Sequence, residues 1–441
     1  MNLRHVASCG LACAVLLLAG CDDGRQPPGK VGVRVVNVAP GFEMLAFQRE
    51  REPNGLSTLS FKGSTESIYD EDLYDFFVYE RALGQNVARS WTFARELDSD
   101  HSYTFVLTEV DGEVQPLIVE HSTGPAAETQ FVAVHAASGL PAIDLYLERP
   151  GVGIAGATPR GSFNAQEEMT ARALPGGDYE LWLTVAGEPA NVLLATTTIT
   201  LPVGVTTMFI VVPEGGQGTE QLSVLMLQAQ PSILYDRDAT SELRVVNGAT
   251  DQAPRDVAID SQFSPPLFSA IPFGEPTPYA PYPTVAAKIN VTPVGNSGAL
   301  ELEQTVAGFP GQRATMLFAG PAGTLFGAFA LDDGRRIDRE AKVRFMSAVS
   351  QFFAVDFVVA LPDADPNFLG AVATLTAPGL SPSYTPLAPG EYDLYVYQAG
   401  TANLLSGPTR FSVEAGGIYS VLTVDGPDTA TVGVRFLDDF P

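Results

Sequence analysis

A short acidic stretch late in the chain has the residue types and spacing of a cation site. The segment DADPN places Asp363, Asp365 and Asn367 at alternate positions, and calcium takes carboxylate and amide oxygens in loops of this kind. An EF-hand loop also needs glycine at its sixth position, where this chain has phenylalanine. Two hypotheses remain: a looser calcium site at a domain junction, completed by Asp332 and Asp333, or a solvated acidic turn.

No group of residues in the sequence predicts catalysis. Beyond the N-terminal segment, the histidines are His101, His121 and His135, and no two share a short metal-ligand motif. The first two could approach across paired strands, but we interpret them as surface residues. No serine lies in a G-x-S-x-G turn, and no glycine-rich segment has the lysine and Ser/Thr of a phosphate loop. We therefore predict no catalytic residue, no enzymatic activity and no cofactor besides the calcium considered above.

Aromatic residues are the best indication of a binding surface. In three related strands, alternation places them on the face opposite the core, at Phe77, Tyr79, Trp182, Tyr395 and Tyr397. Exposed aromatic rings stack on sugars or anchor a protein partner. The other interpretation is that a neighbouring domain or loop covers this face, or that the two faces are exchanged.

The first twenty residues have the parts of an export signal. Arg4 precedes the apolar run LACAVLLLAG, which is shorter than the roughly 20 residues of a membrane-spanning helix. The segment LAGC ends at Cys21 and resembles the bacterial lipobox, in which the cysteine is acylated and becomes the new N-terminus. The other interpretation is an ordinary signal peptide with a chance cysteine. We expect a signal at 1–20, a palmitate-type anchor on Cys21 and a polar tether over 21–30.

Composition restricts the partners and the source of stability. The 441 residues carry a formal net charge of −26, so the surface repels nucleic acid. Hydrophobic residues make up 45% of the chain, which is enough for packed cores. The other cysteines, Cys9 and Cys13, leave with the signal, so these cores must stabilise the fold without disulfides.

Self-similarity organises the rest of the sequence. The segments VRVVNVAP, FVAVHAAS, LRVVNGAT and VRFMSAVS align without gaps and recur at intervals of about 100 residues, the size of a small domain. Each has one polar residue at the same place, for which we predict hydrogen bonds at a strand end: Asn37, His135, Asn247 and Ser347. Short β-rich runs separated by turns follow in every copy, without a sustained helical period.

These patterns predict an all-β protein of four tandem immunoglobulin-like antiparallel β-sandwich domains after a lipoprotein signal peptide. Charged segments at 235–242 and 331–340 are expected junctions. Because the joints are short, we expect a string of domains with limited bending, held to a membrane at one end. The expected domain boundaries are 31–124, 125–235, 236–338 and 339–441.

A second repeated position carries an acid. Asp144, Asp256 and Asp356 each lead a strand, whereas the first copy has Ala46 there. We interpret the aspartates as structural, either bonded to backbone amides of a turn or paired with a neighbouring arginine. Later in the second copy, alternation assigns one strand face to the core, with Tyr179, Leu181, Leu183 and Val185.

The block from VHAASGLPAIDLYLE to LPGGDYELWLTVAG is similar to extracytoplasmic bacterial repeats catalogued as domain of unknown function four-three-nine-seven. The shared features are a Val-rich first strand ending in His or Asn, an Asp-led strand, and a Pro/Gly turn before Tyr. The second copy matches best, the fourth well, and the other two in part. The resemblance implies an immunoglobulin-like fold and an envelope location, but no activity and no catalytic residues.

We therefore expect a non-enzymatic, lipid-anchored cell-envelope protein that presents tandem domains for binding or spacing. Its expected partners are the bilayer, through Cys21, and an envelope glycan or protein; its expected location is extracytoplasmic, at the inner or the outer membrane. Two alternatives stay open: a glycan-binding lipoprotein that uses the aromatic face, and an accessory subunit or enzyme with a site between repeats. The repetition argues against the enzyme, because a single active site would require one copy to acquire a set of catalytic residues, and no copy shows such a set.

Overall fold

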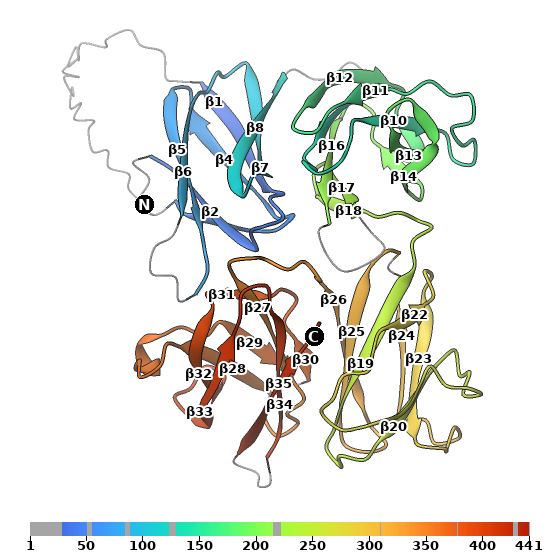
Figure 1. Ribbon diagram of the computed structural model, residues 1–441, viewed down its shortest axis with the longest axis vertical. Coiled ribbons are helices and arrows are strands. Elements are labelled where there is room, and N and C mark those ends of the chain that lie inside the picture. The colour runs from blue at the N-terminus through green and yellow to red at the C-terminus, as the bar shows by residue number, and fades with distance from the viewer. Residues whose placement is uncertain are drawn as a thin grey trace, which may run out of the picture.

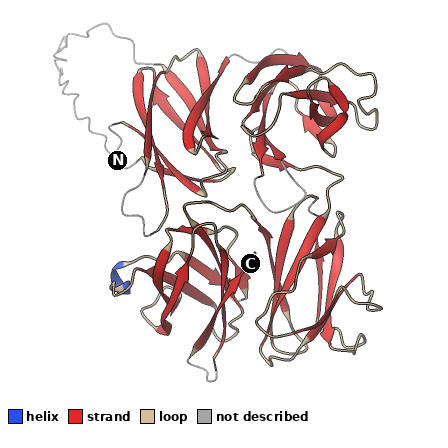
Figure 2. Ribbon diagram, in the orientation of Figure 1, coloured by secondary structure: helices blue, strands red, loops and turns tan. Residues whose placement is uncertain are grey.

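The computed structural model shows four β-sandwiches at the corners of a square, following one another around it in chain order (Figure 1). Strands supply most of the regular structure (Figure 2), and the part of the chain described here has one 3-10 turn, Pro366–Phe368. No helix in that part is long and apolar enough to cross a membrane. The predicted signal and Cys21 lie outside the described residues, which are 29–50, 55–83, 89–122, 129–214, 222–308, 310–376, 378–426 and 431–440.

Each of the first two domains consists of two facing sheets. The first has the strand orders β4-β1-β7-β8 and β3-β2-β5-β6, and the second has β12-β9-β16-β17-β18 and β11-β10-β13-β14, with β15 also paired to β13. The strands of the first are β1 (Lys30–Asn37), β2 (Met44–Arg49), β3 (Ser57–Ser60), β4 (Ser64–Asp70), β5 (Leu73–Glu80), β6 (Ser90–Glu96), β7 (His101–Val110) and β8 (Glu113–Ser122). Those of the second are β9 (Thr129–His135), β10 (Ile143–Glu148), β11 (Gly161–Phe163), β12 (Glu168–Leu174), β13 (Gly177–Val185), β14 (Glu188–Ala195), β15 (Ile199–Leu201), β16 (Thr206–Pro213), β17 (Leu222–Leu227) and β18 (Ser232–Leu234).

The last two domains repeat this plan. The third has the orders β22-β19-β25-β26 and β21-β20-β23-β24, and the fourth has β30-β27-β34-β35 and β29-β28-β32-β33, with β31 also paired to β27. The strands of the third are β19 (Ser241–Ala249), β20 (Arg255–Ile259), β21 (Phe268–Ile271), β22 (Ala280–Tyr282), β23 (Ala287–Pro293), β24 (Leu302–Val306), β25 (Arg313–Gly320) and β26 (Phe326–Asp332). Those of the fourth are β27 (Ala341–Ser347), β28 (Ala354–Ala360), β29 (Ala373–Thr376), β30 (Gly379–Leu380), β31 (Thr385–Leu387), β32 (Gly390–Gln398), β33 (Leu404–Val413), β34 (Ile418–Asp425) and β35 (Val432–Asp438).

The all-β class and the tandem sandwich architecture are thereby confirmed. The strand pairs are antiparallel except for one parallel pair in each domain, which joins the first strand to a late one: β1–β7, β9–β16, β19–β25 and β27–β34. Each domain has a hydrophobic core between its two sheets. Tyr179, Leu181 and Leu183 lie in the core of the second domain, as alternation predicts, whereas Val185 at the strand end is half-buried.

The repeated aspartates fix a turn in each of the last three domains. The side chains of Asp144, Asp256 and Asp356 accept a backbone N–H from a turn glycine at 2.8, 2.8 and 2.9 Å. Those glycines are in the left-handed region, with φ of 77°, 69° and 71°, which favours glycine over other residues. Each aspartate thus holds a tight turn next to its strand. The turn-bond interpretation of this column is confirmed.

Replacing Asp256 with alanine tests this role. The carboxylate also accepts the N–H of Ala270 at 2.8 Å, so two backbone donors would lose their charged partner. We expect a loss of about 1.5–3 kcal/mol in the free energy of unfolding, measured by urea titration. Asp75→Ala, at an exposed position on β5, serves as the control. Equal effects of the two substitutions would contradict the structural role.

The polar column makes the predicted hydrogen bonds in three of its four copies. The side chains of Asn37, His135 and Asn247 accept the main-chain N–H two residues further on, at 3.1, 3.3 and 3.0 Å. The hydroxyl of Ser347 has no hydrogen-bond partner among the described residues. These buried side chains therefore shape the chain as it leaves the first strand of a domain.

The domains do not form a string, and that expectation is wrong. Apolar residues on the outer faces of the first sheets pack domain against domain, joining the first to the second and the third to the fourth. The fourth domain returns to the first, where Leu83 donates its N–H to Pro386 O at 3.0 Å and accepts that of Ala388 at 2.9 Å. Burying these apolar faces removes them from water and holds the domains in two pairs. The contact between the fourth domain and the first then closes the four into one block (Figure 1).

Candidate functional site: a charged cavity at the domain junction

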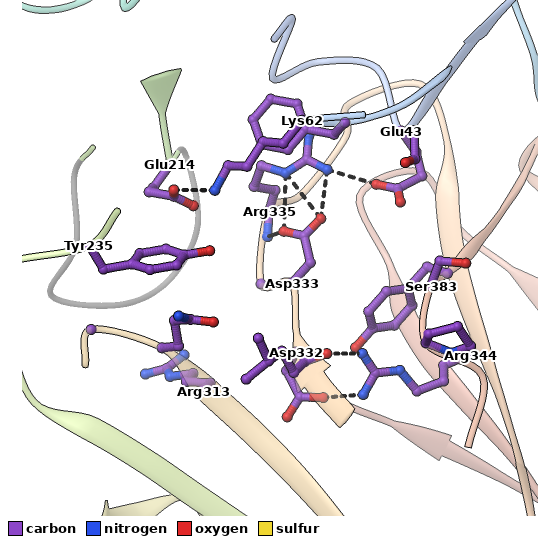
Figure 3. A pocket seen from close by; sticks show the side chains of 18 residues that line it. Glu43, Lys62, Glu214, Tyr235, Arg313, Asp332, Asp333, Arg335, Arg344 and Ser383 are labelled. Atoms are coloured by element: carbon purple, nitrogen blue, oxygen red, sulfur yellow. Dashed lines mark hydrogen bonds and ion pairs between the residues drawn. The ribbon is translucent and has the colours of Figure 1, made fainter. Parts of the chain in front are cut away.

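A cavity of about 300 Å³ lies where the four domains meet, at the lower end of the range for small-molecule sites (Figure 3). Every domain contributes to its wall. The first supplies Glu43 and the turn at 60–62, and the second supplies Glu214. The third supplies Arg313 and Asp332, and the fourth supplies Arg344 with the loop at 382–384. The junctions add Tyr235 and residues 333–335.

Arg335 connects the first domain to the junction between the third and fourth. Its guanidinium donates to Glu43 Oε2 at 2.7 Å, to Pro40 O at 2.6 Å, and to both oxygens of Asp333 at 2.6–3.1 Å. The side chain also lies 3.6 Å over the ring of Phe61 and is 3% exposed. Burial alone would raise the pKa of Asp333, but the positive charges of Arg335 and Lys342 outweigh it and hold that pKa well below its usual value.

A second ionic cluster joins the third and fourth domains. Asp332 pairs with Arg344 and accepts the hydroxyl of Tyr279 at 2.8 Å. Arg244 lies 3.0 Å from Asp439 and donates to Thr315 at 2.7 Å. Burial raises the pKa of Asp439 even though Arg244 acts in the opposite direction. This cluster holds the two domains in a fixed relation along one wall of the cavity.

The charges that line the cavity balance one another. Its four acids, Glu43, Glu214, Asp332 and Asp333, each pair with a cation, and the dashed lines of Figure 3 mark these contacts. Among the four bases, Lys62 joins the first domain to Glu214 of the second. Arg313 pairs with Glu242 at 2.6 Å. The wall is thus neutral overall but rich in donors and acceptors, which suits binding by hydrogen bonds.

The aromatic residues predicted to bind a ligand are not brought together in one surface. Phe77 and Tyr79 stack on β5 with ring centroids 6.4 Å apart, and Tyr395 and Tyr397 do so on β32 at 6.5 Å. All four are half-buried. Trp182 differs, because the guanidinium of Arg237 lies over its ring, 4.6 Å from the centroid. Its indole N–H is buried and has no acceptor among the described residues. Binding at the two stacked pairs remains a prediction.

The acidic segment after β28 forms a local turn. Asp365 accepts the backbone N–H of Asn367 at 3.0 Å and its amide group at 2.8 Å, and Asp363 is in the left-handed region with a φ of 65°. Asp332 and Asp333 are bound to cations in the central cavity and do not complete this segment. Within the described ranges, no group of three His, Cys, Asp or Glu side chains is placed to hold a metal ion. A calcium site at this turn stays a prediction.

The two histidines of the first domain are offset by one register position. His101 pairs with Ser122 and His121 with Ser102, so their side chains point to opposite faces of the sheet. His121 lines an open cleft between the first and second domains, where burial and then the charge of Arg34 lower its pKa. The antiparallel pairing therefore does not form a histidine pair.

Arg335 is not among the site residues that the sequence predicts, and Asp332 and Asp333 enter there only as residues that would complete a calcium site. All three lie in the charged segment LDDGRRIDRE, which the sequence indicates as a junction. Its dense mixture of opposite charges is the available signal. Charges in a solvated linker do not have to be paired, whereas charges in a junction that is buried on several sides do, because an unpaired buried charge is strongly destabilising.

Comparisons with known proteins add no family. No protein-family model and no curated protein matches the chain, so the resemblance to the domain of unknown function stays a prediction. Among solved structures, the TIE protein of Bacillus anthracis is similar at 10% identity over 86% of this chain and 68% of its own, with a TM-score of 0.16. The pilus adhesin SpaC from Lactobacillus rhamnosus GG is similar at 13% identity, with a TM-score of 0.12. The match to SpaC covers 94% of this chain and only 43% of that adhesin, and likenesses at such scores carry no argument about function.

Proposed function

We propose that this is a non-enzymatic, lipid-anchored protein of the bacterial envelope whose four immunoglobulin-like domains form one block for binding. The observation that carries the proposal is the shared cavity, because its wall exists only when all four domains are assembled. The polar residues that recur between domains are used in turns and strand ends. The lining carboxylates are each held by a cation, an arrangement that favours recognition over acid–base catalysis.

Lipid anchoring is tested by replacing Cys21 with alanine in the full chain expressed in a bacterium. We expect the unchanged protein to sediment with membranes and to incorporate labelled palmitate. The Cys21→Ala variant should appear in the soluble extracytoplasmic fraction without label, because acyl chains on that thiol are the proposed anchor.

Cys13→Ala is the matched control, since it removes a thiol of the same apolar N-terminal segment without touching the acylated position. It should keep both the label and the membrane fraction. Palmitate incorporation into Cys21→Ala, or membrane association of that variant equal to that of the unchanged protein, would refute the anchor.

A further inference from the structure

We infer that the cavity at the domain junction binds a small, uncharged, polyhydroxylated ligand of the class of monosaccharides and polyols. This inference rests on the proposed binding function and names the class of ligand. It assigns recognition to the shared cavity, not to the aromatic pairs of the outer sheet faces.

The cavity wall contains polar atoms that the protein does not satisfy. The hydroxyl of Tyr384 has no hydrogen-bond partner among the described residues, although its side chain is only 3% exposed. Nε of Arg344, which lies 4.3 Å over the Tyr384 ring, also lacks a partner. Burial raises the pKa of Tyr384 well above its usual value, so this hydroxyl stays neutral and can both donate and accept. Leaving such buried groups unpaired costs free energy. Both atoms are closed off from solvent in the structure, so a ligand would recover this free energy by drawing the Tyr384 and Arg344 side chains toward the cavity.

The balance of charge in the wall selects against ions. Each acid of the lining already forms an ion pair within the protein, for example Glu214 with Lys62 and Asp332 with Arg344. A charged ligand would have to compete with one of these internal partners and would leave the other buried without compensation. A neutral ligand can bond to the same groups without separating them.

Hydroxyl groups match the remaining chemistry of the wall. A hydroxyl donates once and accepts twice, so a ligand carrying several of them can use carboxylate acceptors and guanidinium donors side by side. Ser60, Gln312 and Ser383 add neutral polar groups to the lining, and Tyr235 adds an aromatic ring with a polar end. In Figure 3 the hydroxyl of Tyr235 points toward the Asp333–Arg335 pair across the open space. The volume of about 300 Å³ restricts the ligand to a small molecule or the end of a chain.

The test is calorimetric titration of the full chain with four neutral compounds: glucose, galactose, N-acetylglucosamine and glycerol. Separate titrations with the charged sugars glucuronate and glucosamine provide the comparison. We expect at least one neutral compound to bind, with glucuronate and glucosamine at least tenfold weaker. Tyr384→Phe removes the unpartnered hydroxyl and should weaken binding about tenfold. Ser383→Trp places a large ring at an exposed position of the wall and should abolish binding.

The control is the double substitution Tyr395→Ala and Tyr397→Ala, which removes one outer aromatic pair and should leave the affinity unchanged. Thermal melting of each variant verifies that it is folded. A free polyol and the terminal sugar of a glycan share this chemistry, so the same sugar coupled to beads through its reducing end distinguishes them. Retention on those beads assigns the ligand to a chain end, and titration without retention assigns it to the free compound.

Flat titrations with every neutral compound would overturn the inference. So would tighter binding of a charged compound, or unchanged affinity in both folded cavity variants. Membrane attachment through Cys21 is measured separately. A flat titration of a protein that is attached in this way would therefore remove the cavity ligand and leave the proposed anchoring intact.

Discussion

Replacing Arg335 with alanine should destabilise the block by about 3–5 kcal/mol, because it leaves the buried carboxylate of Glu43 without its cation. Glu43 is only 5% exposed and pairs with this guanidinium at 2.7 Å, whereas Asp333 is 31% exposed and keeps Lys342 at 2.9 Å. The substitution also removes the bond to Pro40 O. Since Glu43 belongs to the first domain and Asp333 to the junction before the fourth, we expect the contact between those two domains to open.

The measurement combines urea unfolding with small-angle X-ray scattering. Arg335→Ala should lower the unfolding midpoint and increase the radius of gyration. The control is Lys288→Ala, which removes a pair with Glu303, at 2.7 Å, in which the two side chains are 53% and 41% exposed. An exposed pair contributes little, so this variant should keep the dimensions of the block and nearly all of its stability. Equal losses in the two variants would show that the junction has no special role.

The four-domain architecture could be predicted because its determinants lie close together in the sequence. Alternation in a single strand identifies Leu181 and Leu183 as core. The Asp columns and polar columns recur at fixed places because each serves a turn within its own domain. Such local contacts leave a repeated pattern that requires no knowledge of how the domains meet.

The packing of the first domain against the second could not be predicted, because the apolar pattern that causes it is also that of an ordinary core strand. Val36 and Val106 face the second domain, while their neighbours Val35 and Leu107 face the core of the first. A strand buried on both faces is a nearly continuous apolar run, and periodicity alone cannot show what covers its second face. The run VRVVNV has this pattern, and from the sequence alone it indicates only a β-rich strand.

The cavity could not be predicted, because its contacts join residues far apart in the sequence. Arg335 and Glu43 are 292 positions apart, and the chain offers 51 acids as partners for 25 Lys and Arg residues. The covering of Trp182 has the same cause, since the arginine over its ring comes from the junction after the second domain. No spacing rule connects such residues before the domain arrangement is known.

An acid pair at the same domain contact makes the stability of the block depend on pH. Glu340, directly before β27, is 1% exposed, and neither of its carboxylate oxygens has a donor among the described residues. Burial raises the pKa of Glu340 to about 8; the charges of Glu80 and Glu43, from the first domain, add to this, and that of Arg339 opposes it. Glu80 is also buried, with Arg339 Nε at 3.5 Å. Two carboxylates in this position are compatible when Glu340 keeps a proton and donates it to Glu80.

Glu340→Gln should therefore reduce a loss of stability that the unchanged protein shows as pH rises. In the unfolded chain the pKa of Glu340 returns to about 4.5, so its contribution is complete below that pH and is lost as pH rises toward about 8. The slope in this window is at most about 1.4 kcal/mol per pH unit. The effect of Asp333 on stability has the opposite sign, because its lowered pKa stabilises the fold above pH 3.8. Urea titrations between pH 5 and 8 therefore avoid the pH range in which Asp333 titrates. The amide of glutamine donates to Glu80 at every pH and should make the slope less negative, whereas Glu71→Gln, at an exposed turn, should keep it. A slope in Glu340→Gln equal to that of the unchanged protein would refute the shared proton.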